Sequence, residues 1–203
     1  MNKIFSILLV LVSTLLYSQK NANKILRDSV LIKADIFTIM YSEKLEQPLW
    51  VEYDVKCPEG KASRKGMDFY TNDSVYTSNG EDYKNNVWDK GHCAPAADFN
   101  CDTKNLIKTF SYLNCTLQHE KLNRGPWKFL EAYERALASK GYVHIRIEII
   151  FSTDSKKLPT GSTIPTAFKK TIYVNDVLAD SYYFSNEVPK YSDYNKYKMI
   201  INK

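Results

Sequence analysis

The chain has 203 residues, a formal net charge of +5 and hydrophobic residues at 44% of its positions. This length and composition exclude a disordered chain and predict one domain, residues 19–203, with a full hydrophobic core. The mild positive charge is compatible with a polyanionic partner but does not establish one.

The N-terminal segment has the pattern of an export signal. Lys3 precedes a largely apolar run from Ile4 to Leu16, and the small residue Ser18 follows it. A membrane span needs about 20 apolar residues, so we predict that residues 1–18 form a cleaved signal peptide. The expected protein is secreted or periplasmic, with no membrane anchor after cleavage. An uncleaved anchor is the alternative.

Six later segments carry strand signals, because β-branched and aromatic residues are concentrated in them. The clearest alternates apolar and polar residues, as expected for a strand with one buried face. The predicted strands are residues 32–40, 49–55, 87–94, 142–151 (with Val143, Ile145, Ile147 and Ile149 inward), 165–175 and 181–185.

Two helices are predicted between these strands. Asp102 or Thr103 can cap a helix that runs to about Tyr112. A second should cover residues 123–140, because Pro126 suits a first turn and Gly141 suits a C-terminal stop. Residues 60–66 and 74–86 carry turn residues and predict loops. The expected class is α+β, a mainly antiparallel sheet packed with a few helices.

The four cysteines, Cys57, Cys93, Cys101 and Cys115, all lie in the part expected to be exported. An even number outside the cytosol favours two disulfides, for which three pairings are possible. A zinc site is less favoured because there is no Cys-x-x-Cys spacing. If Cys93 and Cys115 are free, they should be small core side chains.

Side chains able to do chemistry are concentrated in residues 88–131. His92 can act as a base near neutral pH, Lys90 adds a cation, and Gly91 permits a close approach of backbone or phosphate. Hydrolysis of a phosphodiester requires a base for water and cationic help for the phosphate, which a divalent metal can supply.

The second predicted helix adds oxygen ligands. Asn123, Trp127 and Glu131 are spaced i, i+4, i+8 and should share one stripe. A carboxamide and a carboxylate on an apolar stripe need partners, and hard cations bind such oxygens. The alternative is that Asn123 caps the helix and Glu131 pairs with Arg135. The two other histidines, His119 and His144, are expected to be structural.

Together these residues resemble a known family. Asp89-Lys90-Gly91-His92 is similar to the Asp-Arg-Gly-His motif of the DNA/RNA non-specific endonucleases, which are ββα-metal nucleases. A second block is similar at every spacing: Asn114, Gln118, Asn123-x-Gly125-x-Trp127 and Leu130-Glu131. Residues 47–53 and 164–169 resemble an early and a late strand of the family, so the similarity covers about residues 41–186.

The resemblance implies a ββα-metal nuclease fold and an endonuclease, dependent on Mg²⁺ or Mn²⁺, that hydrolyses DNA and RNA with little sequence preference. It makes His92 the general base and Asn123 the direct metal ligand, and Glu131 would hold a water of that ion. Asn114 and Gln118 would order the site. Arg64 would contact the phosphate.

Lys90 departs from the family pattern, which usually has arginine there. Lysine keeps the charge but loses the planar fork that binds phosphate in a bidentate manner, so lower activity or a changed substrate pose is expected. Cys93 also replaces a more usual aliphatic residue. Two alternatives stay open, a narrowly specific phosphodiesterase of this fold and a catalytically silent nucleic-acid-binding protein. Retention of His92, Asn123 and Glu131 argues against the second.

Overall fold

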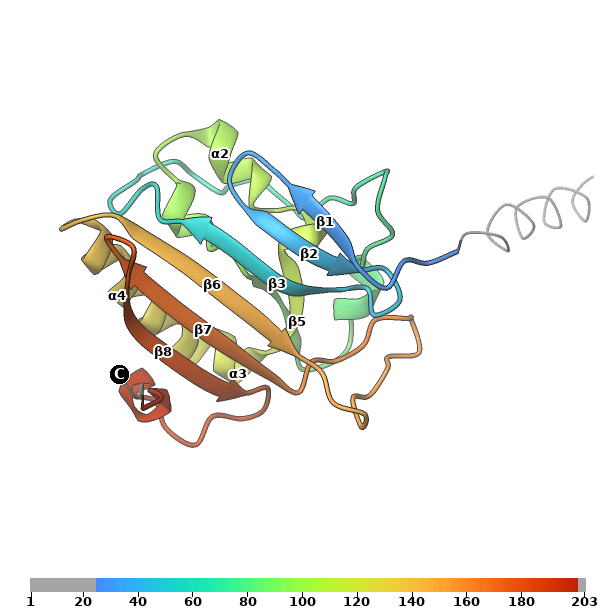
Figure 1. Ribbon diagram of the computed structural model, residues 1–203. Coiled ribbons are helices and arrows are strands. Elements are labelled where there is room, and N and C mark those ends of the chain that lie inside the picture. The colour runs from blue at the N-terminus through green and yellow to red at the C-terminus, as the bar shows by residue number, and fades with distance from the viewer. Residues whose placement is uncertain (1–24, 201–203) are drawn as a thin grey trace, which may run out of the picture.

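The computed structural model describes residues 25–200, so the predicted signal peptide lies outside the described part. Its main element is a six-stranded sheet in which every neighbouring pair is antiparallel. The strand order is β1 (Val30–Lys33), β2 (Thr38–Ser42), β3 (Gln47–Asp54), β6 (Val143–Ile150), β7 (Ala167–Val174) and β8 (Val177–Ser185). The predicted α+β class, with a mainly antiparallel sheet, is confirmed (Figure 1).

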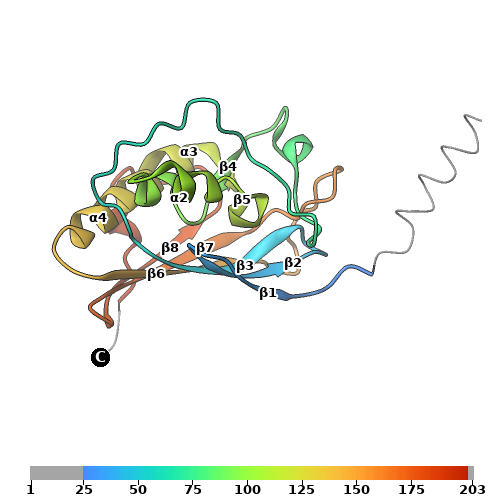
Figure 2. The same cartoon turned by 90° about the horizontal axis from the view of Figure 1, so that it is seen from above.

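A second layer covers one face of this sheet (Figure 2). It contains a two-stranded antiparallel ribbon, β4 (Trp88–His92) with β5 (Cys115–His119). The α-helices of this layer are α2 (Thr103–Lys108), α3 (Glu120–Leu122) and α4 (Lys128–Ala138). Short helical turns complete the chain: η1 (Gly80–Tyr83), η2 (Ala96–Phe99), η3 (Tyr112–Asn114), η4 (Asn123–Trp127) and η5 (Tyr194–Tyr197).

The core lies between the two layers. The predicted alternation on β6 is confirmed, because Val143, Ile145, Ile147 and Ile149 are all buried. From the helical layer, Trp127 packs its ring against Phe168 of β7 and Phe184 of β8, with centroid distances of 5.5 and 5.6 Å. Buried aromatic area of this kind fixes how the helices sit on the sheet.

One strand prediction was wrong in detail, and one strand was missed. Residues 32–40 form parts of two strands, because a tight turn in which Ala34 N–H donates to the Phe37 carbonyl separates β1 from β2. Strand β5 was not predicted at all, although it pairs with β4 along its whole length. Its five residues are all buried, so it lacks the alternation by which a half-buried strand is recognised.

Both helix predictions need correction. The first helix begins as predicted, with the Asp102 side chain accepting from the Asn105 amide, but it ends at Lys108 rather than near Tyr112. The stretch predicted as one helix over 123–140 is divided, because Gly125 has non-helical angles (φ −105°, ψ −122°) and Pro126 follows it. Proline lacks the amide hydrogen and clashes with the preceding turn, which breaks a helix at this point. The predicted loop at 74–86 contains η1 and a buried Asp82.

The expectation of two disulfides was also wrong. Cys57 is bonded to Cys101, whereas Cys93 and Cys115 are free and buried. Residue 92 is directly opposite residue 115 in the ribbon. Because successive side chains of a strand point to opposite faces, the side chains of Cys93 and Cys115 lie on different faces and cannot meet. In residues 25–200, no helix is long and apolar enough to cross a membrane.

Candidate active site

The ribbon and the chain that follows β5 bring the predicted site residues to one side of the molecule. In the ribbon, Gly91 lies opposite Thr116. A Cβ at position 91 would stand 2.7 Å from both Cβ and Oε1 of Gln118, so only glycine permits this packing. The close approach expected at Gly91 is therefore made by the neighbouring strand, and it fixes the position of the next residue, His92.

The His92 imidazole is held between two aromatic rings. Its centroid is 4.7 Å from that of Phe69 and 4.9 Å from that of Phe110. Its Nε2 is buried and has no hydrogen-bond partner among the described residues. Burial, with a smaller effect from the Arg64 charge, lowers the pKa of His92 to about 3. The ring is therefore neutral at ordinary pH and can accept a proton from a bound molecule.

Asn123 is oriented by Asp89. Its Nδ2 lies 2.8 Å from Asp89 Oδ2, and an ionised carboxylate only accepts hydrogen bonds. The amide nitrogen must therefore face Asp89, which leaves Oδ1 of Asn123 free to bind a cation. Arg124 holds the same carboxylate from the other side, with Nε 2.9 Å from Oδ2 and an Nη 2.6 Å from Oδ1.

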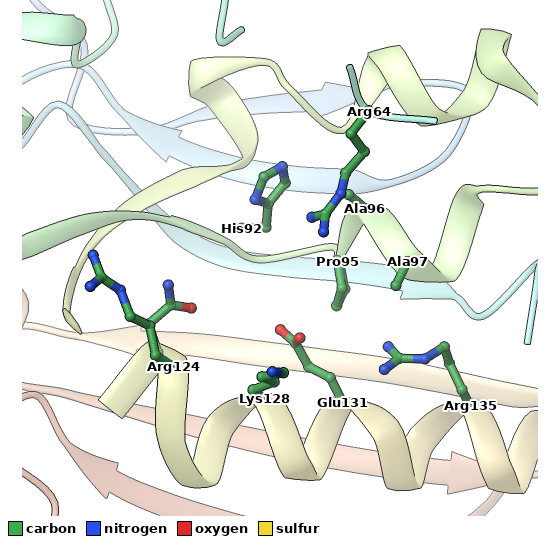
Figure 3. Close-up of a pocket in the computed structure, with 10 residues that line it drawn as sticks. Arg64, His92, Pro95, Ala96, Ala97, Arg124, Lys128, Glu131 and Arg135 are labelled. Carbon is green, nitrogen blue, oxygen red and sulfur yellow. The ribbon is translucent and has the colours of Figure 1, made fainter. Parts of the chain in front are cut away.

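Glu131 points into the cavity from α4, as Figure 3 shows. Burial raises its pKa to about 7, although the nearby Lys170 ammonium acts in the opposite direction. Lys170 is itself fully buried, with Nζ 2.8 Å from Oε1 of buried Glu134. A divalent cation beside Glu131 would favour its ionised form, so the surroundings suit a carboxylate that serves a metal.

The anticipated structural alternative for this stripe is not observed. The side chain of Asn123 bonds to Asp89 instead of capping a helix. Arg135 pairs with buried Asp98 at 2.8 Å rather than with Glu131. In residues 25–200, Glu131 takes part in none of the ion pairs.

Together these groups surround one cavity of about 460 Å³. Arg64 and His92 lie on one side of it, and the side chains of α4 and its N-terminal approach lie on the other (Figure 3). The lining residues are Arg64, His92, Pro95, Ala96, Ala97, Asn123, Arg124, Lys128, Glu131 and Arg135. Four are cationic and one is a carboxylate, a balance that favours an anionic ligand.

Asn114 and Gln118 lie beside the cavity rather than in its lining. Asn114 is fully buried, and its amide donates to the carbonyls of Ala94 and Thr109 while its oxygen accepts from the Ala94 amide. These bonds hold the chain that follows His92. Gln118 packs on Gly91, and its buried carboxamide has no hydrogen-bond partner in the described part of the chain.

Lys90 is not part of the cavity lining either. Its Nζ lies 3.0 Å from Asp68 Oδ1 and over the rings of Phe69 and Tyr112, at 5.4 and 5.6 Å from their centroids. In this arrangement Lys90 links the ribbon to the segment that carries Arg64 and Phe69.

His119 and His144 have structural contacts, as expected. The ring of His119 packs edge-on against Trp88, and its Nδ1 accepts from the Lys121 amide. The Nδ1 of His144 lies 2.9 Å from Asp54 on the sheet.

Three cavity residues were not predicted as functional: Arg124, Lys128 and Arg135. Lys128, Glu131 and Arg135 are spaced i, i+3, i+7 on one face of α4, and Arg124 precedes the break at Gly125 by one residue. This spacing is visible in the sequence and could have identified them.

The residues present fit a hydrated Mg²⁺ ion better than a fully protein-bound metal. No group of three or more His, Cys, Asp or Glu side chains able to hold a metal occurs within residues 25–200. Mg²⁺ commonly keeps several waters and needs few protein oxygens. Asn123 Oδ1 could supply a direct ligand, and Glu131 could accept hydrogen bonds from the ion's waters.

Comparisons with known proteins show what this chain is similar to as a whole. A family model described as DNA/RNA non-specific endonuclease matches residues 18–202. The chain is 33% identical over 107 residues to zebrafish (Danio rerio) mitochondrial nuclease EXOG, covering 50% of this chain and 31% of that protein. It is 30% identical over 117 residues to human mitochondrial endonuclease G (55% and 39%) and 31% identical over 127 residues to Serratia marcescens nuclease (56% and 46%).

The chain therefore spans less than half the length of these relatives. Among solved structures, it is similar to a crystal structure of an EndoG/EndoGI complex, with a TM-score of 0.71 and 23% identity. That match covers 84% of this chain and 80% of the other. It supports the fold.

Proposed function

Because this chain belongs to the DNA/RNA non-specific endonuclease family, we propose that it is a divalent-metal-dependent endonuclease that hydrolyses phosphodiester bonds of DNA and RNA with little sequence preference. The observation that carries the proposal is the convergence of neutral His92, the oriented amide oxygen of Asn123 and the carboxylate of Glu131 on one cation-lined cavity.

In this proposal His92 accepts a proton from the attacking water, since one ring nitrogen of the neutral imidazole is unprotonated. Arg64, on the same wall as His92, binds the reacting phosphate, and Glu131 on the opposite wall orders water beside it. A divalent metal, held by Asn123, would neutralise the negative charge that develops on the phosphate. Contacts made mainly to phosphate explain weak base selectivity.

We also propose that the mature protein is secreted or periplasmic, following cleavage of residues 1–18. The Cys57–Cys101 disulfide supports this proposal, because such bonds persist in oxidising compartments. Some relatives are named as mitochondrial proteins, so export of this chain has to be tested by experiment. N-terminal sequencing of protein recovered from the medium or periplasm should begin near Gln19. Retention of residues 1–18 in the cell fraction would refute export.

The experiment that tests the activity uses supercoiled plasmid and RNA, with Mg²⁺ or Mn²⁺ and with a chelator. Cleavage should require the metal and should be lost in His92→Ala and Asn123→Ala. Asp89→Ala should weaken metal affinity about 10- to 100-fold, because it removes the acceptor that orients Asn123. Asp28→Ala, which removes an exposed acid outside the cavity, is the control.

Each rival has its own outcome in this experiment. Full cleavage by His92→Ala would exclude His92 as the base. Binding of nucleic acid without any cleavage would favour the silent nucleic-acid-binding protein. Cleavage of single strands alone would favour a narrowly specific phosphodiesterase.

A further inference from the structure

The four cations of the cavity differ in whether a protein carboxylate holds them. Arg124 makes two hydrogen bonds to Asp89, and Arg135 pairs with buried Asp98. Within residues 25–200, neither Arg64 nor Lys128 forms an ion pair. Two cations are thus committed to the protein, and two are available to a ligand.

The two available cations come from opposite walls. Arg64 belongs to the segment of residues 57–75 that crosses above the helices, whereas Lys128 is the first residue of α4 (Figures 2 and 3). Arg64 acts electrostatically on His92, so it lies near the proposed reaction centre. Lys128 precedes Glu131 by three residues and shares its helical face, about 4.5 Å nearer the N-terminal end of α4.

Helix stability does not explain a lysine at this position. The N-terminal end of a helix carries partial positive charge, so a cation in the first turn is unfavourable there. The side chain of Lys128 is exposed and lines the cavity, and no carboxylate of the described residues forms an ion pair with it. A polyanion beside α4 would convert this repulsion into attraction.

We propose that Lys128 binds the phosphate adjoining the scissile one, so that the nucleic acid strand runs along α4 between that helix and residues 57–75. This inference rests on the proposed function. Its axial offset from Glu131 is of the same order as the rise per nucleotide of a duplex strand along its axis, about 3.4 Å, and the long, flexible lysine side chain extends its reach towards the next phosphate. Lys128 would then contribute to the affinity for substrates of several nucleotides, while Arg64 serves the reacting phosphate.

The test measures binding rather than turnover. In a His92→Ala background with Ca²⁺ present, a fluorescent single-stranded 12-mer is titrated by anisotropy over a range of salt concentrations. Lys128→Gln should weaken binding about tenfold and reduce the slope of log K against log salt by about 0.7, the value for one lost phosphate contact on a single strand. Lys140→Gln, an equal charge change outside the cavity and just beyond the C-terminal end of α4, should change neither.

Competition by short ligands locates the contact. The loss caused by Lys128→Gln should be large for a tetranucleotide and much smaller for a dinucleoside monophosphate, which has a single phosphate. Equal losses for both would place Lys128 on the scissile phosphate and overturn the assignment. A salt slope equal to that of Lys140→Gln would also overturn it. Failure of the His92→Ala parent itself to bind any nucleic acid would instead count against the proposed function.

Discussion

At the scale of single residues, His92 is placed where its charged form is disfavoured. Two phenylalanine rings enclose the imidazole, and the Arg64 guanidinium adds a like charge. The neutral imidazole is the form that can accept a proton, but a pKa this low makes it a weak base before substrate binds. A bound phosphate would raise that pKa towards neutral, because a nearby negative charge favours the imidazolium form. The same burial has a cost for stability that depends on pH.

We predict that protonation of the unfolded chain makes His92 destabilising below neutral pH. Its pKa is about 3 when folded and about 6.5 when unfolded. Between these values the unfolded state binds the additional proton, so stability falls as pH decreases from 6.5 towards 3. At pH 5 the loss should reach about 2 kcal/mol. Urea unfolding of the wild type and of His92→Leu, each at pH 8 and pH 5, measures it.

The other titrating groups are common to both proteins and cancel in this comparison. The stability difference between His92→Leu and wild type should therefore move in favour of the variant at pH 5. Parallel pH profiles for the two proteins would show that the folded imidazole titrates normally.

At the scale of elements, the β4–β5 ribbon is the part that sets the site's geometry. It carries Asp89 and His92 on β4 and leads directly into the helical segment that bears Asn123. The two strands approach so closely at Gly91 that even a methyl group would stand 2.7 Å from the Cβ atom of Gln118. A change of rotamer cannot relieve this clash, because the position of the Gln118 Cβ is fixed by the backbone.

We therefore predict that Gly91→Ala separates the ribbon and misplaces the site. Overpacking of this kind costs about 1–3 kcal/mol, which thermal unfolding followed by circular dichroism should detect. Nuclease activity should fall further than the remaining folded fraction explains. Gly80→Ala is the control, because a Cβ there meets only the Tyr112 hydroxyl at an ordinary 3.4 Å. Equal effects of the two substitutions would contradict the prediction.

Elements with clear periodicity could be predicted from the sequence, and those shaped by tertiary contacts could not. The alternation on β6 and the cap at Asp102 are local signals, and both agree with the structure. Strand β5 is buried on all sides, so no alternation marks it. The break at Gly125 could have been inferred, because Pro126 four residues into a helix is as consistent with a break as with a first turn.

In the site, too, residues within the motifs could be predicted from the sequence, whereas contacts between distant segments could not. Motif spacing identified His92, Asn123 and Glu131, which do line one cavity. It could not show that Asp89 orients Asn123, because that bond joins residues 34 positions apart. Nor could it show that Lys90 turns to Asp68, since the segment bearing Asp68 has no regular structure to predict its path.

At the scale of the whole molecule, residues 57–75 connect the site to the rest of the fold. This segment passes over the helical layer (Figure 2) and carries both Arg64 and Phe69. Backbone hydrogen bonds from Ala62 to Asn100 and from Tyr70 to Phe110 hold it at intervals. The Cys57–Cys101 disulfide fixes its beginning to the chain that follows η2. The wall of the cavity opposite α4 therefore depends on a covalent link outside the cavity.

We predict that Cys57→Ser with Cys101→Ser lowers the free energy of unfolding by about 2–4 kcal/mol, because the bond closes a long loop in the unfolded chain. The Michaelis constant for nucleic acid should also rise at temperatures where the variant is fully folded, because Arg64 is held less firmly. Urea unfolding and steady-state kinetics measure these effects. Alkylation gives the control for pairing: the unfolded wild-type protein should react at two cysteines, Cys93 and Cys115, before reduction and at four after it. If stability fell but the Michaelis constant did not change, the disulfide would stabilise the fold without contributing to substrate binding.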